Sequence, residues 1–158
     1  MQMEFAGAFA QRCRESDLSV GIQTCGAFRW EAFVSYLPLF EFIHFDLKLI
    51  NPHAHRRVIG AENHTILANA ERLLEAGSAV LFRMPVIPEY TDTRENLRDV
   101  ARFLHERRVR TDATFRRQDA FGGDHAAEVF RRGFIADEQH LFALGGGGVR
   151  AVGVEIQF

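Results

Sequence analysis

Two oppositely charged residues follow an apolar run near the middle of the sequence. Asp46 and Lys48 come after FEFIHF, residues 40–45, with Leu47 between them. Side chains two residues apart project from the same face of an extended chain, so this carboxylate and ammonium are expected to lie side by side. Such a pair could hold the two ends of a zwitterionic ligand. A simple salt bridge between the two groups explains the same pattern equally well.

Polar groups also end two other apolar runs. SVGIQT, residues 19–24, ends at Thr24 and is followed by a Cys-Gly turn, and AVLFRM, residues 79–84, carries Arg83 near its end. The carboxyl ends of parallel strands meet at one edge of a sheet, where ligands bind. If these runs are parallel strands, Thr24, Asp46, Lys48 and Arg83 form a pocket at that edge. The ligand of the pocket is not defined by these residues alone.

Three other groups have side chains that could react or bind a metal. His53 and His55 have a spacing that suits a metal on an extended segment, but no third ligand is near, which favours surface histidines. Cys25 stands where a nucleophile could sit, yet without an assignable base a small buried filler is favoured. Lys48 could form a Schiff base at a strand end, although Asp46 on the same face stabilises its charged form.

The elements that must position these residues alternate along the first two thirds of the chain. Hydrophobic periodicity predicts strands at 19–24, 40–47 and 79–84. Helices are predicted at 4–15, 30–37, 63–76 and 93–108, and Asn51-Pro52 opens a short helical turn. Asn63 is expected to cap the third of these helices and Gly77 to end it. This order implies right-handed crossovers onto a parallel sheet of the α/β class, open or part of a barrel.

The tail is predicted to differ from the rest. Residues 113–148 show no sustained period of 2 or 3.6, and only 149–158 (VRAVGVEIQF) is strand-like again. We therefore expect one α/β unit over 1–110 and a divergent tail over 111–158 that ends in a strand. Either true divergence or translation in a shifted reading frame would explain residues 113–148.

Composition limits the class of protein. The chain has 158 residues, 47% hydrophobic and 25% charged, which suits one globular domain. A formal net charge of −2 argues against a nucleic-acid partner. No apolar run nears the roughly 20 residues that span a bilayer, and no signal peptide follows Met1. With two cysteines, a cytoplasmic location is expected.

Four runs in unbroken order give a family resemblance. They are GIQTCGAFRWE at 21–31, FIHFDLKLINPHAHRRVIGAEN at 42–63, ILANAERLLEAG at 66–77 and VLFRMPVIPEYTDTRENL at 80–97. Together they resemble the glycyl-radical enzyme activating enzymes of the radical S-adenosylmethionine superfamily, whose best-known member activates pyruvate formate-lyase. The match extends from about Met1 to Leu104, and four motifs in the right order and spacing are specific.

The resemblance implies a partial (β/α) barrel that binds S-adenosylmethionine and a [4Fe-4S] cluster. Reductive cleavage in such enzymes yields a 5′-deoxyadenosyl radical, which takes hydrogen from a glycine of a partner glycyl-radical enzyme. A flavodoxin- or ferredoxin-type reductant is implied as well. By matching motifs, Asp46 and Lys48 would contact S-adenosylmethionine, Thr24 would lie by its methionine moiety, and Arg83 would face the active site.

Departures from the family pattern lie at both ends of the chain. The C-x3-C-x2-C motif that holds the cluster is absent, and Cys13 and Cys25 fit neither its spacing nor its place. The glycine-rich strand end is missing too, Gln23 replaces a frequent acidic residue, and TDATFRRQ at 111–118 stands where a histidine strand is expected. We therefore expect an activase fragment that lacks the first strands and is inactive alone. A non-catalytic remnant that docks on the partner is the alternative.

Overall fold

A computed structural model describes residues 3–107, 113–116 and 153–157 of the chain. Within them, helices and strands alternate as far as the fifth helix. In chain order they are α1 (Met3–Glu15), β1 (Gly21–Thr24), α2 (Trp30–Phe33), the 3-10 helix η1 (Val34–Leu39), β2 (Phe42–Asp46), α3 (Pro52–Ile59), α4 (His64–Glu75), β3 (Val80–Pro85), α5 (Arg94–Glu106), β4 (Ala113–Arg116) and β5 (Gly153–Gln157).

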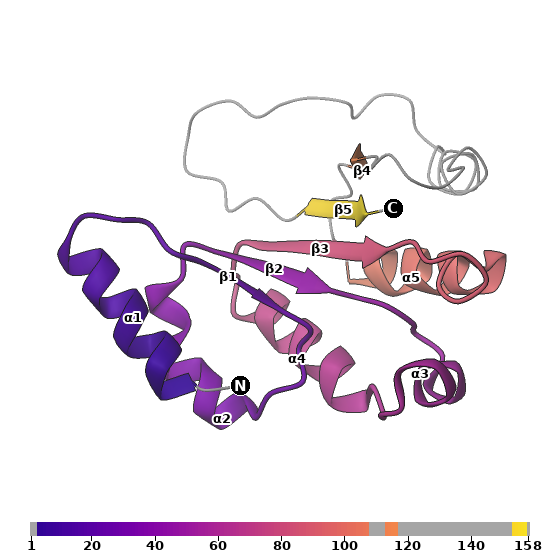
Figure 1. The fold of residues 1–158 in the computed structure, drawn as a ribbon, viewed down its shortest axis with the longest axis horizontal. Helices are drawn as coiled ribbons and strands as arrows, with labels where there is room; N and C mark the ends of the chain where they lie inside the picture. The colour runs from indigo at the N-terminus through magenta and orange to yellow at the C-terminus, as the bar shows by residue number, and fades with distance from the viewer. Residues whose placement is uncertain (1–2, 108–112, 117–152, 158) are drawn as a thin grey trace.

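The described strands form one parallel sheet in the order β1-β2-β3-β5-β4. Figure 1 shows α1, α2 and α4 gathered on one side of β1, β2 and β3, while β5 runs along the other edge of β3. Helices that connect parallel strands must pack back onto the sheet in this way. The predicted α/β class is confirmed, and the open parallel sheet is consistent with a partial barrel.

The core lies between the helices and one face of the sheet. Ile43 and Phe45 of β2 point to this face beside Val80 and Phe82 of β3, and all four are at most 1% exposed. The rings of Phe45 and Phe82 lie 5.5 Å apart. Burial of each such side chain contributes roughly 1.5–3 kcal/mol. Alternate positions of the same strands are therefore free to carry polar groups on the opposite face.

The turn after β1 is fixed by this core. Gly26 has φ of 77°, a left-handed conformation that favours glycine. A Cβ atom on Gly26 would lie 2.2 Å from the Phe45 ring. The backbone therefore crosses the end of β1 closely enough to pack on Phe45, which no other residue type allows without a shift.

The second predicted helix, 30–37, is only partly right. The α-helix ends at Phe33, and Val34–Leu39 forms a 3-10 helix that contains Pro38. Proline lacks an N–H and disfavours the α conformation in the residue before it. The chain therefore tightens into the 3-10 form, and Val34 is left 40% exposed.

The tail contributes two strands, of which one was predicted. The strand expected within 149–158 is present as β5, whereas β4 lies within 111–118, where the family resemblance places a strand but the periodicity of the sequence predicts none. In addition, β5 lies between β3 and β4, so sequence order and spatial order differ. The division of the chain at residue 110 stays a prediction. Most of 113–148, to which the frame-shift hypothesis refers, lies outside the described residues.

Asn63 does not cap α4 through its side chain, although it occupies the N-cap position. Its amide instead donates to the carbonyl oxygens of Leu49 and Ile50, at 2.9 and 2.8 Å. The predicted capping bond is therefore wrong, because the buried carbonyls beyond β2 need donors and the Asn63 amide supplies them. Gly77 follows the helix end with φ of 64°, as predicted for a C-terminal stop.

Asn69 of α4 makes the equivalent contact with the turn after β1. It is 1% exposed, and its amide donates to the carbonyls of Gly26 and Phe28, at 2.9 and 2.8 Å. Within the described residues its Oδ1 atom has no hydrogen-bond partner. The contribution of Asn69 to folding therefore comes from the two bonds that it donates.

Replacing Asn69 with alanine is predicted to lower the free energy of unfolding by about 2 kcal/mol, because two buried carbonyls lose their donor. Urea denaturation followed by circular dichroism measures this change. Thr65→Ala, at an exposed position of the same helix, is the matched control and should change stability by no more than about 0.5 kcal/mol. Equal denaturation midpoints for Asn69→Ala and the unsubstituted chain would contradict the role given to this amide.

Candidate functional site

The chain keeps the alternation of β2 for several residues beyond the strand. Leu47 and Leu49 are 2% and 4% exposed on the core side, whereas Asp46 and Lys48 are partly exposed on the other side. The Leu47 N–H donates to the Arg83 carbonyl at 2.8 Å, which continues the pairing of β2 with β3. Asp46 and Lys48 therefore share one face of the sheet, as their spacing predicts.

Asp46 is the centre of a charged group built from three strands. Its Oδ1 accepts a hydrogen bond from Nε of Arg83 at 3.0 Å. Its Oδ2 accepts from the Gln23 amide at 3.4 Å and lies 4.0 Å from Nζ of Lys48. Asp46 and Arg83 are register partners in β2 and β3, so their side chains emerge on the same face. We call Gln23, Asp46, Lys48 and Arg83 the Asp46 cluster.

Burial differs across the Asp46 cluster. The side chain of Arg83 is 10% exposed, that of Asp46 is 18% exposed and that of Lys48 is 29% exposed. The Arg83–Asp46 contact is short and largely removed from water, so removal of either residue would leave the other as an uncompensated buried charge. The Lys48 contact is long and more exposed, so it is weak. The ammonium of Lys48 consequently keeps hydrogen-bonding capacity for a ligand.

The cluster carries two cationic groups for one carboxylate, which favours an anionic ligand group. The carboxylate of Asp46 offers about four lone-pair sites. Among the described residues, Arg83 and Gln23 donate to two of them. A ligand ammonium could occupy a remaining site. The geometry therefore suits a ligand with both a carboxylate and a cationic group.

Gln23 and His44 were not assigned to the pocket from the sequence. They are register partners in β1 and β2, and Nδ1 of His44 lies 3.5 Å from Nη1 of Arg83. His44 also stacks at a tilt on Phe42, with ring centroids 5.2 Å apart. The alternation 42, 44, 46, 48 was the available signal, because it places His44 on the face of Asp46.

Thr24 lies apart from the other three predicted site residues. It is 8% exposed, and its register partner is Phe45, on the helix-covered face. Its Oγ1 accepts a hydrogen bond from the Gly26 N–H at 3.1 Å. The structure thus brings Asp46, Lys48 and Arg83 together, while Thr24 shapes the turn beside them.

Two of the weaker predictions are wrong about burial. Cys25 is exposed rather than a buried filler. His55 is 3% exposed rather than a surface residue, and its Nδ1 lies 2.7 Å from the Ala61 carbonyl, while His53 is exposed. The helical turn was expected to be short, but α3 extends over eight residues and turns His55 inward. Within the described ranges no three His, Cys, Asp or Glu residues gather as a metal site would require.

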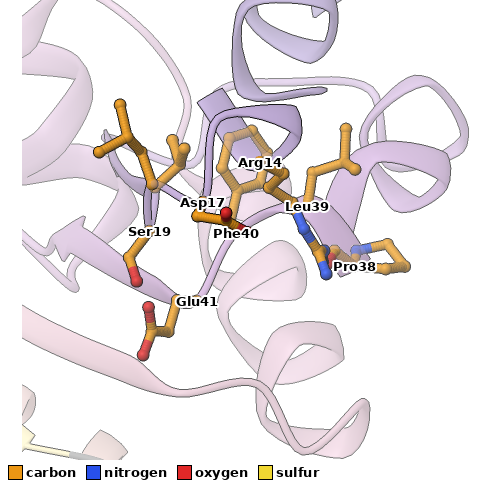
Figure 2. A pocket seen from close by; sticks show the side chains of 9 residues that line it. Arg14, Asp17, Ser19, Pro38, Leu39, Phe40 and Glu41 are labelled. Atoms are coloured by element: carbon orange, nitrogen blue, oxygen red, sulfur yellow. Dashed lines mark hydrogen bonds between the residues drawn. The ribbon is translucent and has the colours of Figure 1, made fainter. Parts of the chain in front are cut away.

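Among the residues that the structure describes, hollows are found at both ends of the strands. One has a volume of about 420 Å³ and is formed by residues that precede β1 and β2. Figure 2 shows its lining side chains, which include Asp17, Ser19 and Glu41. Arg14 in this hollow donates to the Pro38 carbonyl at 2.5 Å. This hollow lies at the amino ends of the strands, opposite the edge where parallel sheets bind ligands.

The second hollow, of about 610 Å³, is at the carboxyl edge. It lies between α3 and α5 and is lined by residues that include Leu49 and Asn96. Leu49 follows Lys48 of the Asp46 cluster in the chain, and Asn96 donates a hydrogen bond to the Lys48 carbonyl.

None of the helices in the described part of the chain is long and apolar enough to cross a membrane.

Comparison with curated proteins gives several relatives. The chain is 32% identical over 110 residues to isethionate sulfite-lyase activating enzyme of Oleidesulfovibrio alaskensis. This aligned segment covers 68% of this chain and 36% of the relative. It is 32% identical over 108 residues to (2S)-3-sulfopropanediol dehydratase activating enzyme of Klebsiella oxytoca, covering 66% and 33%. Over 97 residues it is 34% identical to pyruvate formate-lyase 2-activating enzyme of Escherichia coli, covering 61% and 33%.

The chain therefore spans about a third of the length of the curated relatives that it matches. No protein-family model matches it. The segment shared with the relatives is long enough to contain the strands and helices that build the Asp46 cluster.

Solved structures agree on the fold. A domain of pyruvate-formate lyase-activating enzyme from Bacteroides vulgatus superposes with a TM-score of 0.71 and 21% identity, covering 82% of this chain and 83% of that domain. Streptococcus suis SuiB superposes with a TM-score of 0.55 and 14% identity, covering 73% and 27%. By sequence and by fold, the matched part of the chain is a relative of the glycyl-radical enzyme activating enzymes.

Proposed function

We propose that this chain forms the S-adenosylmethionine-binding edge of a radical activase for a glycyl-radical enzyme. The observation that carries the proposal is the place of its only lysine. Among 19 Lys and Arg residues, Lys48 alone is lysine, and it lies in the Asp46 cluster at the carboxyl edge of the sheet. A compact ammonium and a planar guanidinium are not interchangeable. The one lysine of the sequence therefore supplies the compact ammonium of the Asp46 cluster.

The methionine end of S-adenosylmethionine fits the Asp46 cluster. Lys48 would receive the ligand carboxylate, since its ammonium is only loosely held by Asp46 at 4.0 Å. Asp46 would receive the ligand ammonium, and Arg83 holds Asp46 in place through the bond at 3.0 Å. Thr24 would affect binding indirectly, because its Oγ1 accepts a hydrogen bond from Gly26 and so stabilises the turn beside the ligand.

When bound, S-adenosylmethionine supplies a 5′-deoxyadenosyl group that is released by reduction. In this superfamily the electron comes from a [4Fe-4S] cluster. The residues of this chain do not fit such a cluster, because three cysteines are needed and the sequence has two, Cys13 on α1 and Cys25 after β1. Cluster ligands would have to come from outside the chain, and by itself the chain would bind S-adenosylmethionine without cleaving it.

The partner is proposed from the relatives. Their names tie them to the activation of isethionate sulfite-lyase, sulfopropanediol dehydratase and pyruvate formate-lyase 2. We infer that the protein substrate here is a glycyl-radical enzyme of the same kind, that the reductant is a flavodoxin or ferredoxin, and that the reaction takes place in the cytoplasm. A Schiff-base role for Lys48 is less well supported, because its Nζ lies 4.0 Å from the Asp46 carboxylate, on a partly exposed side chain, and not in an apolar pocket.

Replacing Lys48 with methionine is predicted to raise the Kd for S-adenosylmethionine about tenfold, because one charge-assisted hydrogen bond is lost. Isothermal titration calorimetry on the purified chain measures this Kd. Arg98→Met, at an exposed position of α5, is the control and should leave the Kd unchanged. Equal affinities for Lys48→Met and the unsubstituted chain would remove Lys48 from the binding site.

Anaerobic reconstitution with iron and sulfide tests the assignment of the cluster. The chain alone is predicted to retain less than one [4Fe-4S] cluster per molecule, since two cysteines cannot supply three ligands. Iron analysis and chromatographic detection of 5′-deoxyadenosine after dithionite addition measure this. One full cluster per chain together with 5′-deoxyadenosine formation would show that the chain is a complete activase.

A further inference from the structure

The backbone beyond β2 stays extended although its strand ends at Asp46. Leu47 and Leu49 are buried and Lys48 between them is partly exposed, so the period of two persists to residue 49. The Leu47 N–H still has a strand partner in the carbonyl of Arg83. After it, the carbonyls of Lys48, Leu49 and Ile50 and the N–H of Ile50 have side chains as partners.

Asn96 is the main one of these side chains. Its Nδ2 donates to the Lys48 carbonyl at 2.8 Å, and its Oδ1 accepts from the Ile50 N–H at 3.2 Å. A residue of an adjacent parallel strand makes the same pair of bonds, since its N–H and its C=O bond to a carbonyl and an N–H two residues apart. The amide of Asn96 therefore replaces a neighbouring strand at this point and keeps the chain extended.

Asn96 is itself rigidly held. It is 5% exposed in the first turn of α5, where its N–H donates to Oγ1 of Thr93 at 3.2 Å. The second hydrogen of Nδ2 goes to the Thr91 carbonyl at 2.9 Å. One amide thus joins the ends of β2 and β3 to the start of a helix.

The side of the sheet on which Lys48 emerges depends on this extended backbone. A slip or rotation by one residue in an extended chain moves a side chain to the opposite face. On the opposite face Lys48 would enter the core, next to Leu47 and Leu49. The contact of Lys48 with the Asp46 cluster therefore requires the backbone that Asn96 holds.

We propose that Asn96 is a positioning residue, which fixes the backbone of Lys48 so that its ammonium meets the carboxylate of the ligand. The proposal rests on the proposed function, because it takes S-adenosylmethionine as that ligand. Asn96 does not contact the ligand in this arrangement. Its effect is confined to the ligand group that Lys48 recognises.

Two ligands separate positioning from general support of the fold. S-adenosylmethionine carries the carboxylate, and decarboxylated S-adenosylmethionine lacks it while keeping the ammonium and the adenosine. For Asn96→Ala and the milder Asn96→Ser, the Kd of S-adenosylmethionine is expected to rise about tenfold, the loss of one charge-assisted bond. The Kd of the decarboxylated ligand should not change.

Isothermal titration calorimetry gives both constants on one sample, and their ratio does not depend on the folded fraction. If Asn96→Ala fails to fold, Asn96→Ser carries the test. Asn69→Ala is the matched control, because it also removes a buried amide that donates to two carbonyls, but in the turn after β1. In this control the ratio should equal that of the unsubstituted chain.

Two results would overturn the positioning role. One is an equal weakening of both ligands in the Asn96 variants, which would make Asn96 a purely structural residue. The other is an unchanged Kd for S-adenosylmethionine in a folded variant. A failure of the unsubstituted chain to bind S-adenosylmethionine would be distinct from both, since it overturns the proposed function and the positioning role along with it.

Discussion

The peptide groups that follow β1 and β2 leave the sheet and lose their strand partners while still buried or part-buried. Three asparagine side-chain amides, at the start or in the middle of α4 and α5, form hydrogen bonds with those peptide groups instead. Asn69 holds Gly26 and Phe28, Asn63 holds Leu49 and Ile50, and Asn96 holds Lys48 and Ile50. Each bond is worth only about 1 kcal/mol net, but a buried carbonyl without a donor costs about 1–3 kcal/mol. The carboxyl edge of the sheet depends on these amides.

The chemistry of the edge follows from what the amides hold in place. Because the chain stays extended past Asp46, Lys48 returns to the face that Asp46, His44 and Gln23 already share. Arg83 approaches from the next strand and fixes the carboxylate, since Asp46 and Arg83 are register partners. The single lysine of the chain is then the least buried cation of the cluster and the one with capacity for a ligand.

The sequence predicted the alternating features of this site well. Period-two spacing places Asp46 and Lys48 on one face, and apolar runs locate β1, β2 and β3 within two residues at each end. The Arg83–Asp46 bond depends on strand register, which the spacing within one strand does not contain. Thr24 was grouped with the pocket for the same reason, since only its pairing with Phe45 shows that it faces the helices. The bonds of Asn69 to Gly26 and Phe28, and those of Asn96 to Lys48 and Ile50, join residues more than 40 positions apart, beyond the reach of any local pattern.

The central claim is that Lys48 binds the ligand, and its status as the only lysine allows a direct measurement. Chain labelled with 13C-lysine gives one Cε–Hε cross-peak in a heteronuclear NMR spectrum, next to the ammonium of Lys48. Titration with S-adenosylmethionine is predicted to shift this cross-peak in a saturable way, with the same midpoint as the binding measured by calorimetry. An unmoved cross-peak in a chain that has bound S-adenosylmethionine would contradict the claim.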